Sequence, residues 1–271
     1  MTPVPTHEFL QHTLEAAKQI VAASGALVRE HWDRPRRIHH KGPKDLVTET
    51  DLAVEALLRE RLSALLPQST FLGEEGSAKQ GLQGLVWVVD PVDGTTNFAH
   101  GVPFVATSVA LCQDGAPVLG LVNLPILGEL FTAATGCGAW LNDKPIQVSD
   151  TAVLVESLVA TGFPYNIEPH LQTILRQLEA AMPATQGVRR PGAAALDLAY
   201  VACGRFDGFF EFALNPWDTA AGVLLITEAG GRVGRMSGTG PYRLGDADIL
   251  ASNGHLHAQL QAMLTTAAQD A

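Results

Sequence analysis

The sequence is poor in cysteine and contains no long apolar run. Its 271 residues include 3 cysteines, Cys112, Cys137 and Cys203, which are widely spaced and form no CxxC pair. This spacing argues against a disulfide framework and a cysteine zinc site, so we expect three reduced thiols. No segment approaches the roughly 18 apolar residues of a membrane-spanning helix, and no basic region precedes an apolar stretch at the amino terminus. These absences predict a cytoplasmic protein with no membrane association.

Positive charge is also scarce. The chain has 18 lysine and arginine residues against 28 aspartate and glutamate residues, a formal net charge of −10. Nucleic-acid binding needs a basic surface, so we expect no direct contact with nucleic acid. A dinucleotide fingerprint, a Gly-Lys-Ser/Thr phosphate loop and a Gly-x-Ser-x-Gly elbow are all absent, which argues against nucleotide-loop and serine-hydrolase chemistry. The 46% of apolar residues can still build a sizeable core.

Two carboxylates follow a predicted buried strand. The valine-rich run over residues 85–89 is typical of a strand buried on both faces, and Asp90 and Asp93 come at its carboxyl end. Gly94 permits a sharp turn or a close approach to an anion. Thr95, Thr96 and Asn97 are all candidate caps for a following helix, whose free N–H groups can face a phosphate. Taken alone, this pattern is also that of a simple Asp-Gly turn.

Two further acidic segments change that interpretation. Glu74 and Glu75 lie between glycines after an apolar pair, and Asp218 precedes the apolar run 220–226. Separately, the first segment is typical of a solvated turn and Asp218 of a helix N-cap. Together they supply only hard oxygen ligands, which suit Mg²⁺ or Mn²⁺ rather than zinc. We therefore predict a metal site built from Glu74, Asp90, Asp93 and Asp218.

Apolar periodicity predicts two amino-terminal helices and an antiparallel meander. The helices are expected from about Thr6 to Trp32 and from Thr50 to Pro67, and both cover one face of a meander from Leu85 to Ala134. Further on, predicted helices near 171–182, 193–203, 219–229 and 255–268 alternate with strands near 155–160, 206–212 and 248–252. We therefore expect an α+β half over residues 1–150 and an α/β half over residues 151–271, with a boundary near Asp150.

The histidines receive no functional role. His39 and His40 stand among arginines and are expected in a solvated basic loop. His170, His255 and His257 are expected at the protein surface, in helices or at their ends.

The acidic segments resemble, in order and separation, the signatures of the inositol monophosphatase family of magnesium-dependent, lithium-sensitive phosphatases. Residues 90–98 match the first signature, and residues 217–222, continued by 228–231, match the second. Further matches span residues 41–51, 161–164 and 192–197, so the resemblance covers nearly the whole chain. It implies a layered αβαβα sandwich with the active site between the two halves, and a tendency to form a homodimer. Ala193 departs from the pattern, because many relatives carry a serine or threonine there.

The resemblance also implies the metal ligands. Glu74, Asp90 and the carbonyl of Val92 would hold one Mg²⁺, and Asp90, Asp93 and Asp218 a second, with Mn²⁺ as a possible substitute. Two such ions clamp the phosphoryl oxygens during an in-line displacement. Glu75 is expected to support the cluster through water and to help seat a weaker third ion.

Catalytic and substrate roles follow from the same resemblance. The proton of the attacking water would pass to Glu74 or to a Thr95–Asp51 pair, and Lys41 would place a positive charge near the phosphate. The expected substrate-binding residues are Asp93, Gly94, Thr95, Gly192, Ala193, Glu211 and Asp218. Of these, Glu211 is also interpretable as the end of a strand.

The expected substrate is a phosphate monoester. Nucleotide bisphosphatases and histidinol phosphatases of the superfamily carry a lysine soon after the Asp-Gly-Thr, where this chain reads Thr96-Asn97-Phe98. This difference favours inositol 1-phosphate or a related polyol or sugar phosphate. Two alternatives stay open: another substrate, such as a nucleotide bisphosphate or histidinol phosphate, and a non-enzymatic role as a protein partner of a transcription complex.

Overall fold

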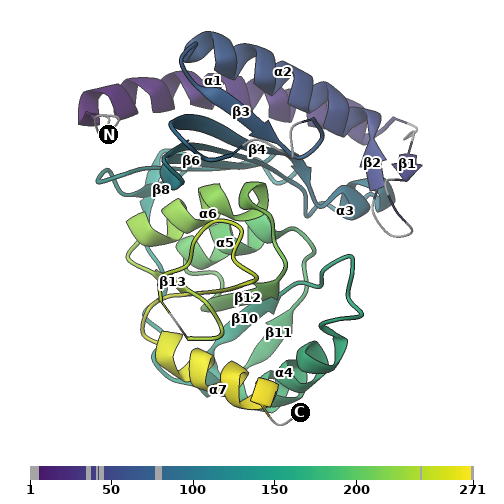
Figure 1. Cartoon of the computed structure of the whole chain (residues 1–271), viewed down its shortest axis with the longest axis vertical. Coiled ribbons are helices and arrows are strands. Elements are labelled where there is room, and N and C mark those ends of the chain that lie inside the picture. Colours follow the sequence, from purple (N-terminus) through teal and green to yellow (C-terminus); the bar gives the residue numbers. More distant parts are fainter. Residues whose placement is uncertain are drawn as a thin grey trace.

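The computed structural model describes residues 6–34, 38–40, 42, 46–76, 81–238 and 240–269. The described chain stacks helices and sheets in five layers (Figure 1). Helices α1 (His7–Trp32) and α2 (Glu49–Leu65) cover a seven-stranded sheet, and α5 (Ala194–Ala202) and α6 (Pro216–Glu228) separate it from a five-stranded sheet. Helices α4 (Leu171–Ala184) and α7 (His257–Gln269) cover the far face of that second sheet. The predicted αβαβα sandwich is confirmed.

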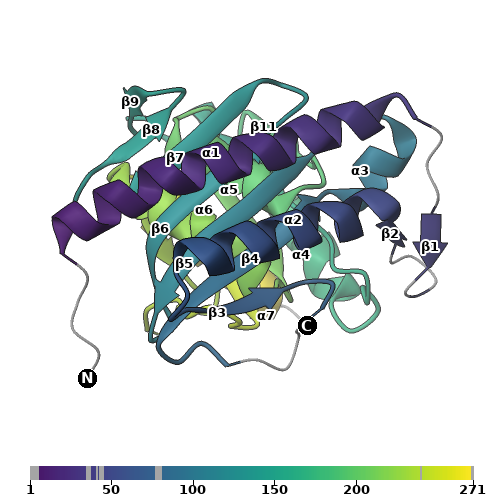
Figure 2. The ribbon, with the colours of Figure 1, turned by 90° about the horizontal axis from the view of Figure 1, so that it is seen from above.

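The first sheet contains the predicted meander. Its strand order follows the sequence, with β3 parallel to β4 and all other pairs antiparallel. Helices α1 and α2 lie side by side over one face, as predicted (Figure 2). The sequence patterns did not predict β3, β8 and β9, which are three or four residues long and too short to show a period. The strands are β3 (Thr70–Gly73), β4 (Leu85–Asp93), β5 (Ala106–Gln113), β6 (Ala116–Leu124), β7 (Glu129–Ala134), β8 (Ala139–Leu141) and β9 (Lys144–Ile146).

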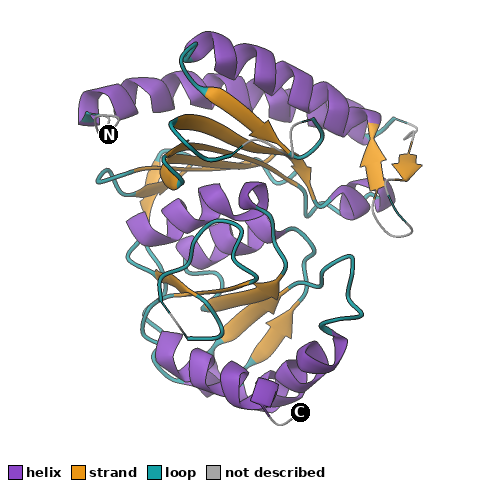
Figure 3. Ribbon diagram, viewed as in Figure 1, coloured by secondary structure: helices purple, strands orange, loops and turns teal. Residues whose placement is uncertain are grey.

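The second sheet mixes parallel and antiparallel pairs in the order β11-β10-β12-β14-β13. The three predicted strands are present, although residues Leu154–Glu156 form a 3₁₀ turn before β10. Helix α3 (Thr95–His100) lies at one end of the first sheet, together with the antiparallel pair of β1 (Ile38–His40) and β2 (Leu46–Thr48) (Figure 3). The strands are β10 (Leu158–Thr161), β11 (Gly187–Arg189), β12 (Gly208–Phe212), β13 (Arg232–Gly234) and β14 (Asp248–Ser252).

One apolar core joins residues from both halves of the chain. Val88 and Phe131 of the first sheet share a buried cluster with Leu196 of α5 and Ala221 of α6. Helix α6 packs directly on β6, since a Cβ at Gly120 would lie 2.8 Å from the carbonyl oxygen of Ala221. The division of the chain near Asp150 therefore stays a prediction, because the central helices of the second half pack on the sheet of the first.

Two local expectations were wrong. His39 was expected in a loop but belongs to strand β1, whose backbone pairs with β2. His257 was expected at the surface but is 1% exposed, and its Nδ1 lies 2.9 Å from the hydroxyl of Ser252. The neighbouring Arg36 and Arg37 lie outside the described residues. All three cysteines are free, and among the described helices none has the length and apolar character needed to cross a membrane.

Close packing of α5 on α6 yields a first prediction. A Cβ at Gly222 would lie 2.4 Å from the Cβ of Leu198, so any side chain there must push the two helices apart. We expect Gly222→Val to lower the free energy of unfolding by about 1–3 kcal/mol, the usual cost of overpacking. Chemical denaturation measures the change, and the control is Gly81→Val, where the added Cβ meets nothing within 4 Å. Equal stability of both variants would contradict this packing.

Candidate active site

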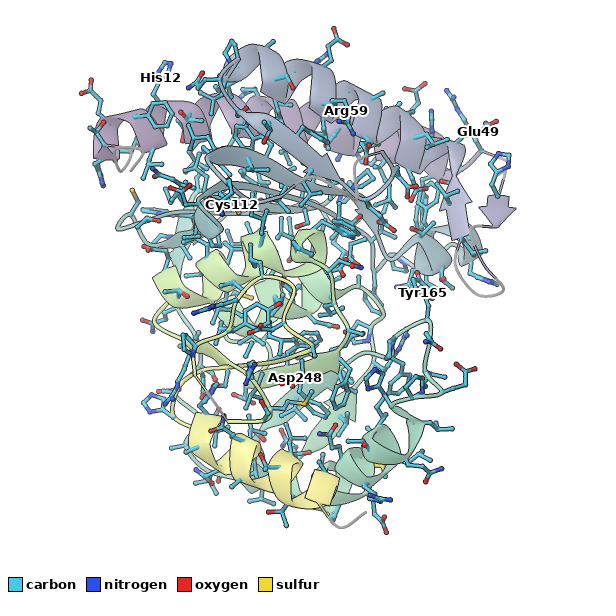
Figure 4. All side chains as sticks on the ribbon, in the orientation of Figure 1. His12, Glu49, Arg59, Cys112, Tyr165 and Asp248 are labelled. Carbon is cyan, nitrogen blue, oxygen red and sulfur yellow. The ribbon has the colours of Figure 1, made fainter. Side chains whose placement is uncertain are left out.

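One cavity, of about 190 Å³, is lined by residues from both halves of the chain. Exposed Tyr165, in the loop after β10, stands at its edge between the two halves (Figure 4). The cavity brings together most of the residues predicted from the sequence. These are Glu74, Asp90, Val92, Asp93, Gly94, Thr95, Gly192, Ala193, Glu211 and Asp218.

An irregularity in β4 turns both of its aspartates toward this cavity. Residues three apart on a regular strand point to opposite faces. Here the pairing of β4 with β5 shifts between Asp90 and Asp93, as a β-bulge does. Within the bulge, Asp90 Oδ1 accepts the N–H of Val92 at 3.0 Å, and the Pro91 carbonyl accepts the Thr107 hydroxyl at 2.9 Å. The bulge therefore lets both carboxylates line one site.

Asp93 also supplies a cap to helix α5. The N-cap residue of α5, Ala193, makes no side-chain cap, and Asp93 Oδ2 accepts the N–H of Ala195 at 2.7 Å instead. Gly94 follows with φ of 87°, and a Cβ there would lie 2.8 Å from the carbonyl oxygen of Phe104. The missing hydroxyl at position 193 thus costs the helix no cap, because a carboxylate about a hundred residues away replaces it.

Asp218 enters the cavity from the first turn of helix α6. Asn215 is the N-cap, and Asp218 Oδ2 accepts the Asn215 N–H at 2.7 Å from the third helical position. The simple interpretation of Asp218 as the N-cap was therefore wrong by three residues. The Ser108 hydroxyl donates to the Trp217 carbonyl at 3.0 Å, which ties this turn to β5 beside Asp90.

Asp51 reaches the cavity only through Thr95. The Thr95 hydroxyl lies 3.0 Å from Asp51 Oδ1 and 3.0 Å from the Val92 carbonyl. Asp51 Oδ2 accepts the Thr48 N–H at 2.9 Å and also the Thr48 hydroxyl, completing a capping box at the start of α2. Asp51 is fully buried, and burial raises its pKa despite these hydrogen bonds. The predicted Thr95–Asp51 pair is thus in direct contact.

The carboxylates of the cavity resist ionisation. Burial, then the charges of Glu74 and Asp93, raises the pKa of Asp90 well above its ordinary value. Burial raises the pKa of Asp93 to about 7, and burial with the charge of Asp93 raises the pKa of Asp218 to about 8. Within the described residues, no three His, Cys, Asp or Glu side chains already form a metal-binding group. The donor set, all oxygen and mutually repulsive, nevertheless fits hard divalent cations.

Glu211, which belongs to β12, also lines the cavity. Burial, followed by the charge of Asp218, raises the pKa of Glu211 to about 8. A Cβ at Gly162 would lie 2.1 Å from Glu211 Oε2, so the 161–164 segment needs glycine beside this carboxylate. Glu211 is therefore built into the site rather than a simple strand end.

The lining also contains residues that were not predicted as site residues from the sequence, among them Arg190, Asp197 and Tyr165. Arg190 lies with its guanidinium 5.2 Å from the ring centroid of Phe163. Asp197 is 1% exposed, and its Oδ1 has no hydrogen-bond partner among the described residues. Tyr165 follows the 161–164 match directly. The matched segments 161–164 and 192–197 were the available signals, but their spacing does not show which side chains face a cavity.

One predicted residue, Glu75, lies elsewhere. Glu75 lines a separate surface depression, together with Leu52 and Arg59 of α2, rather than the cavity. Its expected role at a third ion stays a prediction. Lys41 and Asp45 lie outside the described residues.

Comparison with known proteins finds relatives along nearly the whole chain. The sequence model of the inositol monophosphatase family matches residues 10–271. An inositol-1-monophosphatase from Synechocystis sp. is 43% identical over 269 residues, covering 98% of this chain and 93% of that protein. The Nus factor SuhB of Pseudomonas aeruginosa is 39% identical and covers 95% of this chain and 96% of its own. The solved structure of the inositol monophosphatase from Anabaena (Nostoc) sp. matches with a TM-score of 0.86 and 39% identity, covering 95% of this chain and 96% of that chain.

Proposed function

Since the chain belongs to the inositol monophosphatase family and is a phosphatase, we propose that it hydrolyses inositol 1-phosphate or a related polyol or sugar phosphate with Mg²⁺. The observation that carries this proposal is the convergence of Glu74, Asp90, Asp93 and Asp218 on one cavity. Burial and mutual repulsion raise the pKa values of its aspartates. Such a cluster is costly without cations, and its oxygen donors match Mg²⁺.

The ligand assignment in this proposal follows the family resemblance. Glu74, Asp90 and the Val92 carbonyl would hold one ion, and Asp90, Asp93 and Asp218 would hold a second. Mn²⁺ would substitute for Mg²⁺, and Glu75 would help to seat a weaker third ion through water. When bound, these ions supply positive charge for the phosphoryl oxygens and lower the pKa of a coordinated water. In this proposal Asp93 is both a metal ligand and the cap of α5, where its Oδ2 accepts the Ala195 N–H.

The protein's own residues then orient the phosphate and accept a proton. In the proposal, the amides of Gly94 and Thr95 bind the phosphate, and Gly192 and Ala193 lie beside Gly94 in the same cavity. Thr95 donates its hydroxyl proton toward Asp51 and keeps oxygen lone pairs for the attacking water. Glu74 is the alternative proton acceptor. Lys41 adds positive charge near the phosphate.

The segment Thr96-Asn97-Phe98, which has no lysine, supports a polyol substrate over a nucleotide bisphosphate or histidinol phosphate. Within it, the Asn97 amide donates to the carbonyl oxygens of Phe104 at 2.8 Å and Pro191 at 2.9 Å. Asn97 therefore has a structural task beside the cavity, because it holds the segment that leads into Gly192.

A screen of phosphate release tests the proposed function. Purified protein is offered inositol 1-phosphate, glycerol 2-phosphate, sugar phosphates, histidinol phosphate and a nucleotide bisphosphate, with Mg²⁺ or with excess chelator. We expect Mg²⁺-dependent release that is fastest with inositol 1-phosphate or a close polyol phosphate. No release from any monoester would contradict the proposal.

A second candidate function is favoured by one comparison. A relative that covers nearly the whole chain is named Nus factor SuhB. We therefore also propose that this protein acts as a partner of a transcription complex. Such a role would use surface residues and would survive Asp93→Asn, whereas hydrolysis would not. A homodimeric state, a cytoplasmic location and inhibition by lithium complete the proposal from the family resemblance.

Glu211 provides a prediction about substrate choice. Glu211→Gln is expected to lower kcat/KM for inositol 1-phosphate by an amount equivalent to about 1–3 kcal/mol, since a substrate hydroxyl loses its carboxyl partner. The kcat/KM for glycerol 2-phosphate, which lacks that hydroxyl, should fall much less. Steady-state kinetics on both substrates give the comparison, with exposed Glu60→Gln as the control. Equal losses would remove Glu211 from substrate recognition, and an altered Mg²⁺ requirement would place it among the metal ligands.

A further inference from the structure

The segment that carries Glu74 is wrapped around a buried carboxylate of helix α2. Glu55 is 5% exposed. Its Oε2 accepts a hydrogen bond from the backbone N–H of Glu75 at 2.8 Å, and its Oε1 accepts one from Arg59 Nη2 at 2.7 Å. Glu55 thus holds the residue directly after Glu74, although neither it nor Arg59 lines the catalytic cavity.

The two flanking glycines approach the same pair closely. A Cβ at Gly73 would lie 2.4 Å from Glu55 Oε2. A Cβ at Gly76 would lie 2.8 Å from Arg59 Nη2 and 2.8 Å from Glu55 Oε1. Neither glycine has a left-handed φ. Close approach to the Glu55–Arg59 pair, rather than a special backbone conformation, therefore explains the Gly-Glu-Glu-Gly pattern.

The pair itself is anchored to the sheet. The Arg59 guanidinium lies 4.2 Å from the ring centroid of Phe71 in β3, and Figure 4 shows Arg59 on α2 beside this strand. On the other side, the Glu74 N–H donates to the Val89 carbonyl of β4 at 3.2 Å. The backbone of Glu74 is thereby held at its own amide by β4 and at the next amide by Glu55.

We propose that Glu55, oriented by Arg59, is a positioning residue that holds Glu74 in place for the metal and so sets the metal affinity of the site. This inference rests on the proposed function, in which Glu74 is a ligand. Without Glu55, the Glu75 N–H loses this buried acceptor, and the segment loses one of its contacts with α2. The ligand then spends less time in its binding position, while the remaining ligands and the reacting groups are unchanged.

The test measures metal binding directly. Binding of Mn²⁺ is followed by electron paramagnetic resonance, without substrate, in the wild type, Glu55→Ala, Glu55→Gln and the control Glu60→Gln. We expect Glu55→Ala to raise the Mn²⁺ Kd by about 10–100-fold, as for other groups that orient metal ligands, and to leave kcat at saturating Mg²⁺ within about threefold. Glu55→Gln keeps one oxygen acceptor and should rescue most of the affinity. Glu60→Gln should behave as the wild type.

A double variant separates this inference from the proposed function. Glu74→Gln alone should weaken Mn²⁺ binding, and adding Glu55→Ala should weaken it no further, because Glu55 acts through Glu74. Unchanged Mn²⁺ binding in Glu74→Gln would overturn the ligand assignment itself. If Glu74→Gln weakens binding but Glu55→Ala does not, or if the two losses add, the positioning role is wrong.

A second approach covers the case in which Glu55→Ala fails to fold. Gly76→Ala leaves both side chains of the pair intact and displaces the segment from them by the added methyl group. It should raise the Mn²⁺ Kd in the same direction, with kcat retained at saturating Mg²⁺. A folded Gly76→Ala protein with wild-type Mn²⁺ affinity would overturn the inference.

Discussion

Replacing Asp93 by asparagine is expected to lower kcat by about 10³-fold or more, since a bound divalent ion contributes several kcal/mol of transition-state stabilisation and each 1.36 kcal/mol is tenfold in rate. The neutral amide still offers an oxygen to the Ala195 N–H, so the cap of helix α5 is kept. Removing one of several repelling carboxylates should leave the metal-free protein at least as stable as the wild type. The variant therefore loses activity without unfolding.

The measurement is phosphate release under saturating Mg²⁺, together with the melting temperature in excess chelator. Exposed Asp150→Asn is the matched control and should keep full activity. The wild type in excess chelator should be as inactive as the variant. Wild-type activity that survives chelation, or an Asp93→Asn protein with nearly full turnover, would contradict a metal site at this position.

Removing the metal is expected to make the protein progressively less stable as the pH rises from 6.5 to 8. The pKa is about 7 for Asp93 and about 8 for Asp218 in the folded state, because burial disfavours their ionised forms. Both ionise at about pH 4 in the unfolded chain. Between these pKa values the folded state binds more protons than the unfolded state. The contribution of the two carboxyl groups to the free energy of unfolding is therefore complete below about pH 4 and is lost as the pH rises through the folded-state pKa values.

The expected size follows from the same numbers. A carboxyl with a folded-state pKa near 8 lowers the free energy of unfolding by about 2 kcal/mol between pH 6.5 and 8. This loss lowers Tm by about 4–8 °C in a protein of this size. Bound Mg²⁺ interacts with the ionised carboxylates and should remove most of this decline. The Tm difference between saturating Mg²⁺ and chelator should therefore be larger at pH 8 than at pH 6.5.

Glu211, whose pKa burial also raises to about 8, adds to the decline within this interval, whereas His257 and Cys112 titrate outside it. Burial lowers the pKa of His257 to about 4. Its contribution to the free energy of unfolding therefore increases with pH between about 4 and 6.5 and is constant above that. Burial raises the pKa of the Cys112 thiol to about 12, which affects stability only near and above the pKa of an unfolded thiol, about 8.5. A metal-free Tm that is flat or rises across the interval would contradict the repulsive cluster.

Local sequence patterns were sufficient for most helices, for the meander and for the acidic segments of the site. Helix α1 buries Leu10, Leu14, Ala17, Val21 and Val28 at helical spacing, a pattern read over neighbouring residues. The valine-rich run before Asp90 predicted a buried strand for the same reason. The family resemblance added which acidic segments meet, and the cavity contains them.

Other features depend on contacts between distant segments. The cap that Asp93 gives to α5 joins residues about a hundred positions apart, and so does the contact of Asn97 with Pro191. Glu55 is also distant from the segment it holds. Short strands such as β3 have too few residues for a period, and their pairing partner decides their structure.

The sequence by itself determined the chemistry of the protein, because the acidic residues and their flanking turn residues are local properties of the chain. Only the tertiary structure decided which of those residues share a cavity and which support it from outside. Glu74 and Glu75 are neighbours in sequence, yet one lines the cavity and the other a depression against α2. The physical reason is that burial, hydrogen-bond geometry and close glycine contacts arise from packing between layers, which no local period records.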